Sequence, residues 1–155
     1  MIGARTELDL TPIDGLNQSG IRRATRIGLN RAASPVKASV EAHATAVKRF
    51  GYLAKSIRIR LRLYPADRFV AVVGPASKFT RTKGVYKRGK RKGEKRLFKP
   101  SKYAHLVERG TRHSKAKPWL KPAHDATAAR FLQVAGYEVG AELEHQLFRT
   151  FKVKK

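Results

Sequence analysis

The side chains that could do chemistry are few and scattered along this chain. Cysteine is absent from the 155 residues, which excludes disulfides, thiolate zinc sites and cysteine nucleophiles. The five histidines show no pair with the i, i+4 spacing of a helical metal site. His124 and Asp125 are adjacent, so on a helix they should point about 100° apart and form no oriented pair by themselves. We therefore expect neither a metal site nor a cofactor.

Two other segments have the outline of a catalytic motif. Residues 84–91 resemble a phosphate-binding loop, but they lack the Ser or Thr that would bind magnesium, and no apolar strand leads directly into them. Glu108 is the acid among the cations that could belong to a magnesium-dependent nuclease. We expect that the protein is not an enzyme, and a nuclease is the remote alternative.

Charge is the outstanding property of the sequence. Lys and Arg number 35 against 11 Asp and Glu, a formal net charge of +24 that predicts an anionic partner. A dense cationic tract runs from Lys78 to Lys102, with Glu94 as its one acid. Its basic residues, our candidate contacts for a polyanion or a partner, are Lys78, Arg81, Lys83, Lys87, Arg88, Lys90, Arg91, Lys92, Lys95, Arg96, Lys99 and Lys102.

The tract shows neither strand nor helix periodicity, so we predict a long loop or an open hairpin inserted at residues 76–102. Repulsion between like charges should keep it mobile until an anion neutralises it. Phe79, Tyr86 and Phe98 are interleaved with the cations, either as contacts to a partner or as anchors to the rest of the domain. The alternative is a solvated loop that aids solubility, although such surfaces normally mix both signs of charge.

Apolar spacing predicts helical structure in the N-terminal third. From Leu16 onward the stripe steps by threes and fours, which indicates an amphipathic helix. Pro35 should break or kink this helix, with Ser34 as the cap of a second segment. That segment should end near Phe50, with Gly51 as a C-terminal glycine cap.

Period-two alternation predicts strands. Residues 56–63 alternate strictly, so that Ile57, Ile59, Leu61 and Leu63 face one way and Arg58, Arg60 and Arg62 form the outer face. Residues 64–67 supply a turn into a second, mostly buried strand at 69–73, which makes an antiparallel hairpin. Leu8 and Leu10 suggest a further short edge strand.

The C-terminal third should hold the last helix. Residues 103–108 form a short apolar segment that could be helix or strand. Residues 115–123 are framed by prolines and lead into a helix over about 123–148, with Pro122 in its first turn. Its apolar stripe is Ala128, Leu132, Ala135, Val139, Leu143 and Leu147. Gly136 and Gly140 would permit a close neighbour, and the helix carries four acids (Asp125, Glu138, Glu142, Glu144), which hints at head-to-tail contacts between copies.

Three motifs carry a family resemblance. They are Gly51-x-Leu53-x-x-Ser56-Ile57, then Tyr103-Ala104-x-x-Val107-Glu108-x-Gly110-Thr111, then Ala116-x-Pro118-Trp119-Leu120-x-Pro122-Ala123. In combination they resemble the tail-completion, or neck, proteins of long-tailed double-stranded DNA phages and, more distantly, the minor tail protein Z of phage lambda. Arg109 and Trp119 depart from the family pattern, which usually has an aromatic residue and a Phe there. Physically these residues fit core and turn roles, and we expect Trp119 in the core.

The resemblance implies a structural protein. It would form a homo-oligomeric ring of six or twelve copies at the head–tail junction of the virion, and it would be made in the host cytoplasm without membrane contact. Its neighbours would be a head–tail adaptor or stopper, tail terminator or tail tube proteins, and the packaged double-stranded DNA. The alternatives are a tail terminator at the same junction and a free-standing nucleic-acid-binding protein of ribosomal or chromatin type.

The fold class follows from the order of the elements. We predict an α+β fold in which a small antiparallel sheet is covered by a long N-terminal helix, kinked near Pro35, and a long C-terminal helix. Residues 1–155 should form one domain that carries the basic insertion.

Overall fold

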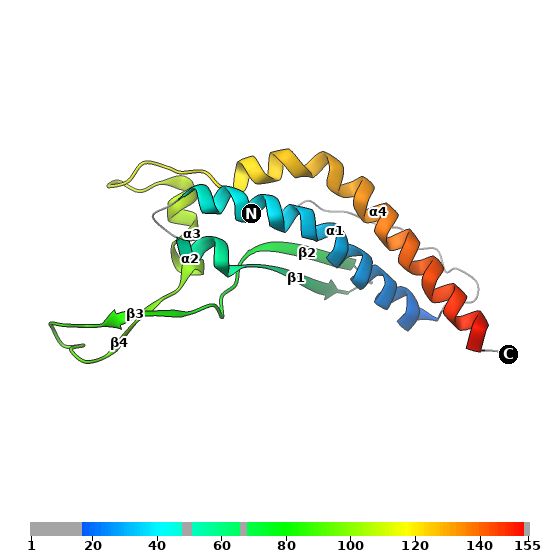
Figure 1. Ribbon diagram of the computed structural model, residues 1–155, viewed down its shortest axis with the longest axis horizontal. Coiled ribbons are helices and arrows are strands. Elements are labelled where there is room, and N and C mark those ends of the chain that lie inside the picture. The colour runs from blue at the N-terminus through cyan, green and yellow to red at the C-terminus, as the bar shows by residue number, and fades with distance from the viewer. Residues whose placement is uncertain (1–16, 48–50, 66–67, 154–155) are drawn as a thin grey trace.

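Two long helices lie side by side, with a small sheet against one of them and an arm that projects from one end (Figure 1). The computed structural model describes residues 17–47, 51–65 and 68–153, without the side chains of Lys83 and of 150–153. The predicted strand at Leu8 and Leu10 lies outside this part. The elements are α1 (Gln18–Ala46), α2 (Gly51–Ser56), β1 (Ile57–Tyr64), β2 (Arg68–Pro75), β3 (Arg81–Val85), β4 (Lys95–Phe98), α3 (Pro100–Arg109) and α4 (Leu120–Val153). The predicted α+β fold is confirmed.

Helix α1 is continuous across Pro35, so a break there is wrong, whereas the kink within one long helix stays a prediction. It begins at Asn17, whose side chain accepts a hydrogen bond of 2.8 Å from the backbone N–H of Gly20. Ser34 does not cap a second segment, because its hydroxyl donates to the carbonyl of Asn30 within the same helix. Buried residues on both sides of Pro35, such as Leu29 and Val40, pack against other elements. That tertiary packing outweighs the one backbone hydrogen bond that proline removes.

The end of α1 also differs from the prediction. The helix ends at Ala46, with Val47 as its C-cap, and Gly51 is the first residue of the short helix α2. Gly51 is therefore not a C-terminal cap. Within α2, Leu53 is fully buried, and the hydroxyl of buried Ser56 donates to the carbonyl of Leu53. These two motif residues help to attach β1 to the core.

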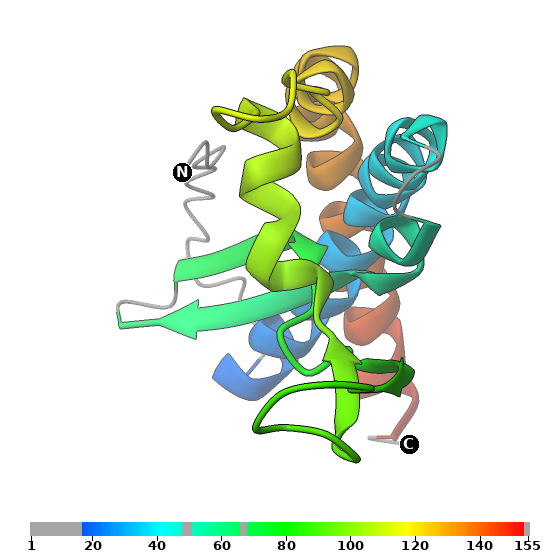
Figure 2. The same ribbon diagram turned by 90° about the vertical axis from the view of Figure 1, so that its left-hand side faces the viewer.

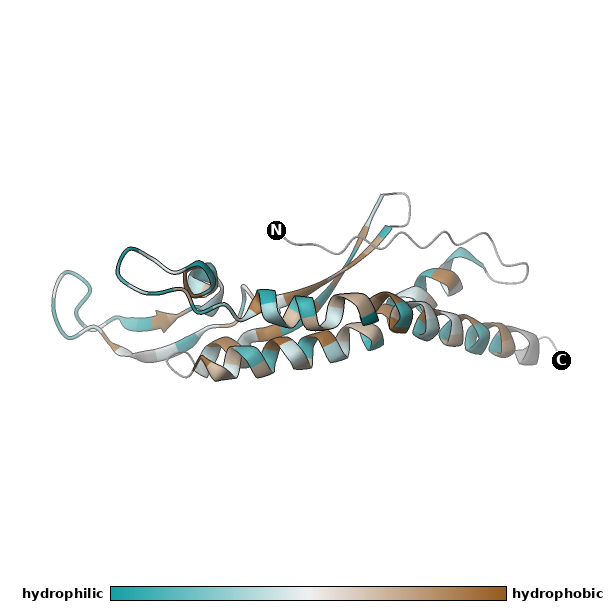
Figure 3. Ribbon diagram, turned by 90° about the horizontal axis from the view of Figure 1, so that it is seen from above, coloured by the Kyte–Doolittle hydropathy of each residue, from teal (hydrophilic) through white to brown (hydrophobic). Residues whose placement is uncertain are grey.

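Strands β1 and β2 form the predicted antiparallel hairpin, with Ile59 opposite Val73 and Leu61 opposite Ala71. Ile57 is fully buried, and the apolar side chains that follow it pack toward α1. The side chains of Arg58 and Arg62 are exposed, as the alternation predicts, whereas Arg60 is half-buried and its Nε is shielded from solvent. Leu63 is 50% exposed, at the end of the hairpin that diverges from the long helices (Figure 3).

The core has two parts. One joins the C-terminal half of α1 to α2, the start of β1, α3 and Trp119, and the other joins the N-terminal half of α1 to α4. In the second part the two helices come closest at Gly28, where an added Cβ would lie 2.6 Å from the Cα of Val139. Among the described residues, no atom of another element lies within 4 Å of a Cβ built at Gly136 or Gly140. The glycine that allows the helices to approach within this chain is thus Gly28, and not the pair that the sequence suggested.

Helix α4 is longer than predicted at both ends and has Pro122 in its first turn, as expected. Ala135, Val139 and Leu143 are buried against α1, in agreement with the predicted stripe. Leu132 is 51% exposed, which contradicts that stripe, and Phe131 packs against the core instead.

Candidate polyanion-binding surface

The cationic tract forms an arm that we define as residues 76–99. Strands β3 and β4 pair as an antiparallel hairpin that projects away from the helices (Figure 1). The tip at residues 86–94 is closed by backbone hydrogen bonds of 3.0 Å from Tyr86 N–H to the carbonyl of Glu94 and from Gly93 N–H to the carbonyl of Tyr86. The structure thus presents the tract as a two-stranded ribbon with a folded tip.

Most cations of the tract point into solvent. Ten of the twelve candidate residues are exposed, Lys99 is half-buried, and the side chain of Lys83 lies outside the described part of the structure. Within the described residues, one ion pair is found among them, between Arg91 and Glu94 at 2.6 Å. This pair and the 4.7 Å contact of the Arg91 guanidinium with the Tyr86 ring hold the tip together. The hydrogen bond that Arg91 donates to the carboxylate of Glu94 raises the pKa of Arg91.

The three aromatic residues of the tract have different roles. Phe98 anchors the arm, because its ring lies 4.7 Å from that of Tyr103 on α3 and 5.7 Å from that of Tyr52 on α2. Burial raises the pKa of Tyr103 to about 12, so this phenol stays neutral beside the arm. Phe79 lies under the guanidinium of Arg81 at 5.7 Å. The aromatic residues thus anchor and order the arm within the chain.

A second basic segment, the loop of residues 110–118, lies at the same end of the molecule. Figures 1 and 3 show this hydrophilic loop and the arm projecting from that end. A turn between Thr111 and Ser114 shapes the loop, and Lys117 N–H donates to the carbonyl of Val107. Its basic residues are all exposed; they are Arg112, His113, Lys115 and Lys117. This loop was not among the sites predicted from the sequence, although four Lys and Arg residues and no acid over residues 109–117 could have indicated it.

Gly110 makes this loop possible. Its φ of 78° lies in the left-handed region, and an added Cβ would be 2.7 Å from the backbone nitrogen of Ala116. A side chain at this position would therefore conflict with both the backbone conformation and the packing of the loop.

Glu108 has a structural role that excludes it from a nuclease site. One of its carboxylate oxygens accepts from the backbone N–H groups of Trp119 (2.8 Å) and Leu120 (2.9 Å), and the other accepts from Lys121 (3.0 Å). The carboxylate thus caps the N-terminus of α4 from the preceding helix, where the helix dipole also favours negative charge. Trp119 itself is 2% exposed and packs in the core.

His124 and Asp125 do contact one another, which corrects our expectation from their spacing. The Nδ1 of His124 lies 3.2 Å from an Asp125 Oδ1, because side-chain rotation brings the two tips together although their Cα–Cβ bonds diverge. The pair lies on the surface of the first turns of α4, and Asp125 is 60% exposed. In the described part of the chain, no three acidic or histidine side chains gather as they would around a metal ion.

Almost all described acids are engaged within the chain. Six of the seven have a partner: Glu41 with Lys37, Glu94 with Arg91, Glu108 with the start of α4, Asp125 with His124, and Glu138 and Glu142 with Arg31. Only Glu144 has none among the described residues. The acids of α4 that suggested head-to-tail contacts are therefore largely occupied. The described surface offers exposed cations with few carboxylates to neutralise them.

The environment of the Glu142 carboxyl should make the stability of the fold depend on pH. The side-chain hydrogen bond from Gln146 and the charges of Arg31 (3.1 Å) and His145 lower the pKa of this buried carboxyl below 4.5. A lowered folded-state pKa adds stability above the unfolded pKa, and this stability is lost as the pH falls through the folded pKa. We expect the free energy of unfolding to fall below about pH 5, and less steeply in Glu142→Gln. Urea titrations from pH 3 to 7 check this; equal slopes for both proteins would contradict it.

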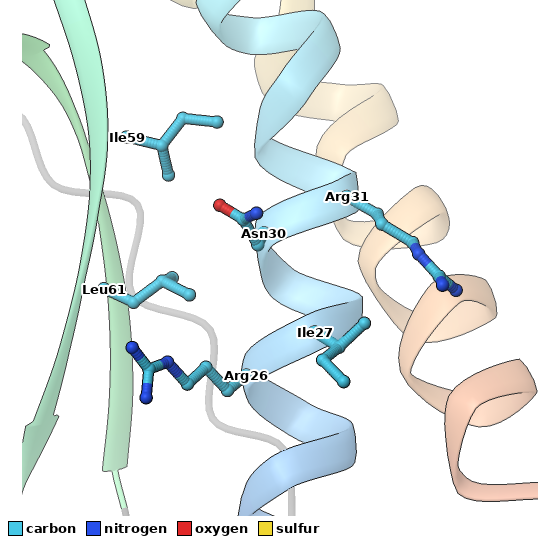
Figure 4. Close-up of a pocket in the computed structure, with 6 residues that line it drawn as sticks. All are labelled: Arg26, Ile27, Asn30, Arg31, Ile59 and Leu61. Atoms are coloured by element: carbon cyan, nitrogen blue, oxygen red, sulfur yellow. The ribbon is translucent and has the colours of Figure 1, made fainter.

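A pocket of about 380 Å³ lies between α1 and β1 (Figure 4). Arg26 and Asn30 point from α1 toward Ile59 and Leu61 on β1, whereas Arg31 points away toward α4. Among the described residues that line it, none is an acid, a histidine or a hydroxyl residue that could act as a general base or a nucleophile.

Sequence comparison identifies the family. Residues 13–110, which include α1, the sheet, the arm and α3, match the family described as "Bacteriophage HK97-gp10, putative tail-component". No curated protein and no solved structure matches the chain, and none of its described helices is long and apolar enough to cross a membrane. The match includes the first motif and the second motif as far as Gly110, but it does not extend the resemblance to the minor tail protein Z. The chain belongs to the HK97-gp10-like family of bacteriophage tail components.

Proposed function

We propose that this protein is a structural component of the phage head–tail junction, and that it assembles as a ring whose basic arms hold an external polyanion. Family membership supports a structural role in the virion tail region and favours it over a ribosomal or chromatin-like role. We propose specifically that the ring has six or twelve copies and lies at the neck. There it would contact adaptor, stopper, terminator or tube proteins.

The observation that carries the proposal is the projecting arm. Its cations are exposed on a hairpin that Phe98 fixes to the core, so the charge is presented at a defined distance from the body of the protein. A partner must bring the opposite charge from outside, because six of the seven described acids are already engaged. Packaged DNA and acidic faces of neighbouring ring proteins both meet this requirement.

Two measurements test the proposal. Sizing of the purified protein by light scattering should give a closed multimer, since a ring requires identical contacts between successive copies. Titration of random duplex DNA should give an affinity that falls about a thousandfold between 50 and 200 mM salt, if about six phosphates are neutralised. Copurification with tail or portal components would support the junction, whereas a monomer that binds host RNA tightly would contradict it.

A further inference from the structure

We infer that the polyanion is duplex DNA and that the loop of residues 110–118 is a second contact to the same duplex. This inference rests on the proposed function and adds a binding element to it. The arm ends at Lys99, directly before α3, and the loop begins at Gly110, directly after α3. The helix α3 therefore sets the separation between the two cationic elements.

The length of α3 suits a groove of DNA. Because α3 has ten residues and rises 1.5 Å per residue, the points where the arm and the loop join it lie about 15 Å apart. The major groove of B-DNA is about 12 Å wide and admits a two-stranded β-ribbon. Figure 2 shows the arm and the loop at opposite ends of α3. The arm can thus reach one row of phosphates, or enter the groove, while the loop contacts the other row.

The chemistry of the loop favours phosphates over a protein partner. None of its residues from 110 to 118 is a large exposed hydrophobic side chain. Protein interfaces normally have a core that is depleted of charge, and this loop could supply none. Within the described residues, its three strong cations Arg112, Lys115 and Lys117 form no ion pair, because Glu108 is held by the start of α4. They can each neutralise a phosphate without first breaking a contact.

Three charge-matched variants of the full chain test this inference. The loop variant is Arg112→Gln, Lys115→Gln, Lys117→Gln, and the arm variant is Lys87→Gln, Arg88→Gln, Lys92→Gln. The control variant is Arg23→Gln, Arg62→Gln, Arg149→Gln. These exposed residues belong to the N-terminal part of α1, the end of β1 and the C-terminal part of α4, and these segments lie at the end of the molecule away from the arm (Figure 1). Each loses three positive charges. Affinity for a random duplex of about 14 base pairs is measured from 50 to 200 mM salt, together with circular dichroism to show that each variant is folded.

We expect the loop and arm variants each to reduce the magnitude of the slope of log K against log salt by about 2.7, which corresponds to three phosphate contacts. Between 50 and 200 mM salt, the factor by which the affinity of each variant falls should then be about 40 times smaller than the factor for the parent chain. The control should keep the parent slope. A loop variant that matches the control while the arm variant loses slope overturns this inference but leaves the proposed function standing. If the parent chain does not bind duplex DNA, both DNA contacts are overturned, and an acidic protein takes the place of DNA in the proposed function.

Discussion

Glu108→Ala should lower the free energy of unfolding by about 3 kcal/mol. The substitution removes an ionised acceptor from three backbone N–H groups at the start of α4. Hydrogen bonds to charged groups contribute about 1.5–3 kcal/mol each, and loss of a helix cap costs about 0.5–2 kcal/mol, but the three bonds share one carboxylate and do not add fully. Urea denaturation followed by circular dichroism gives the value, with an unchanged m-value expected.

Glu144→Ala is the matched control for this experiment. Glu144 is an exposed acid on α4 without a partner among the described residues, so its removal changes the net charge equally. Its effect should stay within about 0.5 kcal/mol. The loss of unfolding free energy in Glu108→Gln should lie between the losses in Glu108→Ala and Glu144→Ala, because the neutral amide oxygen can still accept a hydrogen bond. If Glu108→Ala and Glu144→Ala have the same effect, the capping role of Glu108 is wrong.

Gly28→Ala should destabilise the fold by about 2–3 kcal/mol, although alanine is the better helix former. The added methyl group would lie 2.6 Å from the Cα of Val139, so α1 and α4 must move apart along their shared core. Gly136→Ala has the same gain in helix propensity and meets no atom within 4 Å, and it should stabilise by about 0.5–1 kcal/mol. Thermal unfolding of both variants measures the contrast. If the unfolding temperatures of both variants shift in the same direction, α1 and α4 do not approach closely at Gly28.

The two basic elements and the capping glutamate form one structural unit. Helix α3 carries the arm at its N-terminus and the loop at its C-terminus, and Glu108 near that C-terminus holds the start of α4. The motif residues therefore fix the relative position of the arm, the loop and the long helices. In the proposed function these motif residues present the cations, most of which are exposed in the described part of the chain.

Local patterns determined much of the fold. Strict alternation along residues 57–63 predicted β1 and its arginine face, and 3.6-residue spacing predicted the buried stripes of α1 and α4. These predictions succeeded because each depends on neighbours within a few residues, where burial on one side imposes the period. The position of the cationic tract could also be read directly, since charge density needs no partner.

Predictions that depended on distant neighbours were the ones that failed. Pro35 lies within one continuous helix because packing on both of its sides outweighs the lost hydrogen bond. Gly28, and not Gly136, is the glycine at a helix crossing, because the crossing point is set by the relative placement of α1 and α4. Leu132 is exposed although it continues the apolar stripe. Long helices curve around a core, so a fixed residue spacing does not stay on the buried face along the whole helix.

The amino-acid sequence by itself determined the α+β class, the hairpin of β1 and β2, the location of the cationic arm and the family motifs. Only the tertiary structure decided that Glu108 caps α4, that Arg31 engages Glu138 and Glu142, and that a second basic loop lies at the end that carries the arm. The physical reason is that these relations join groups that are 11 or more residues apart in the chain. Their geometry is fixed by how the helices pack, and no local pattern of charge or hydropathy encodes it.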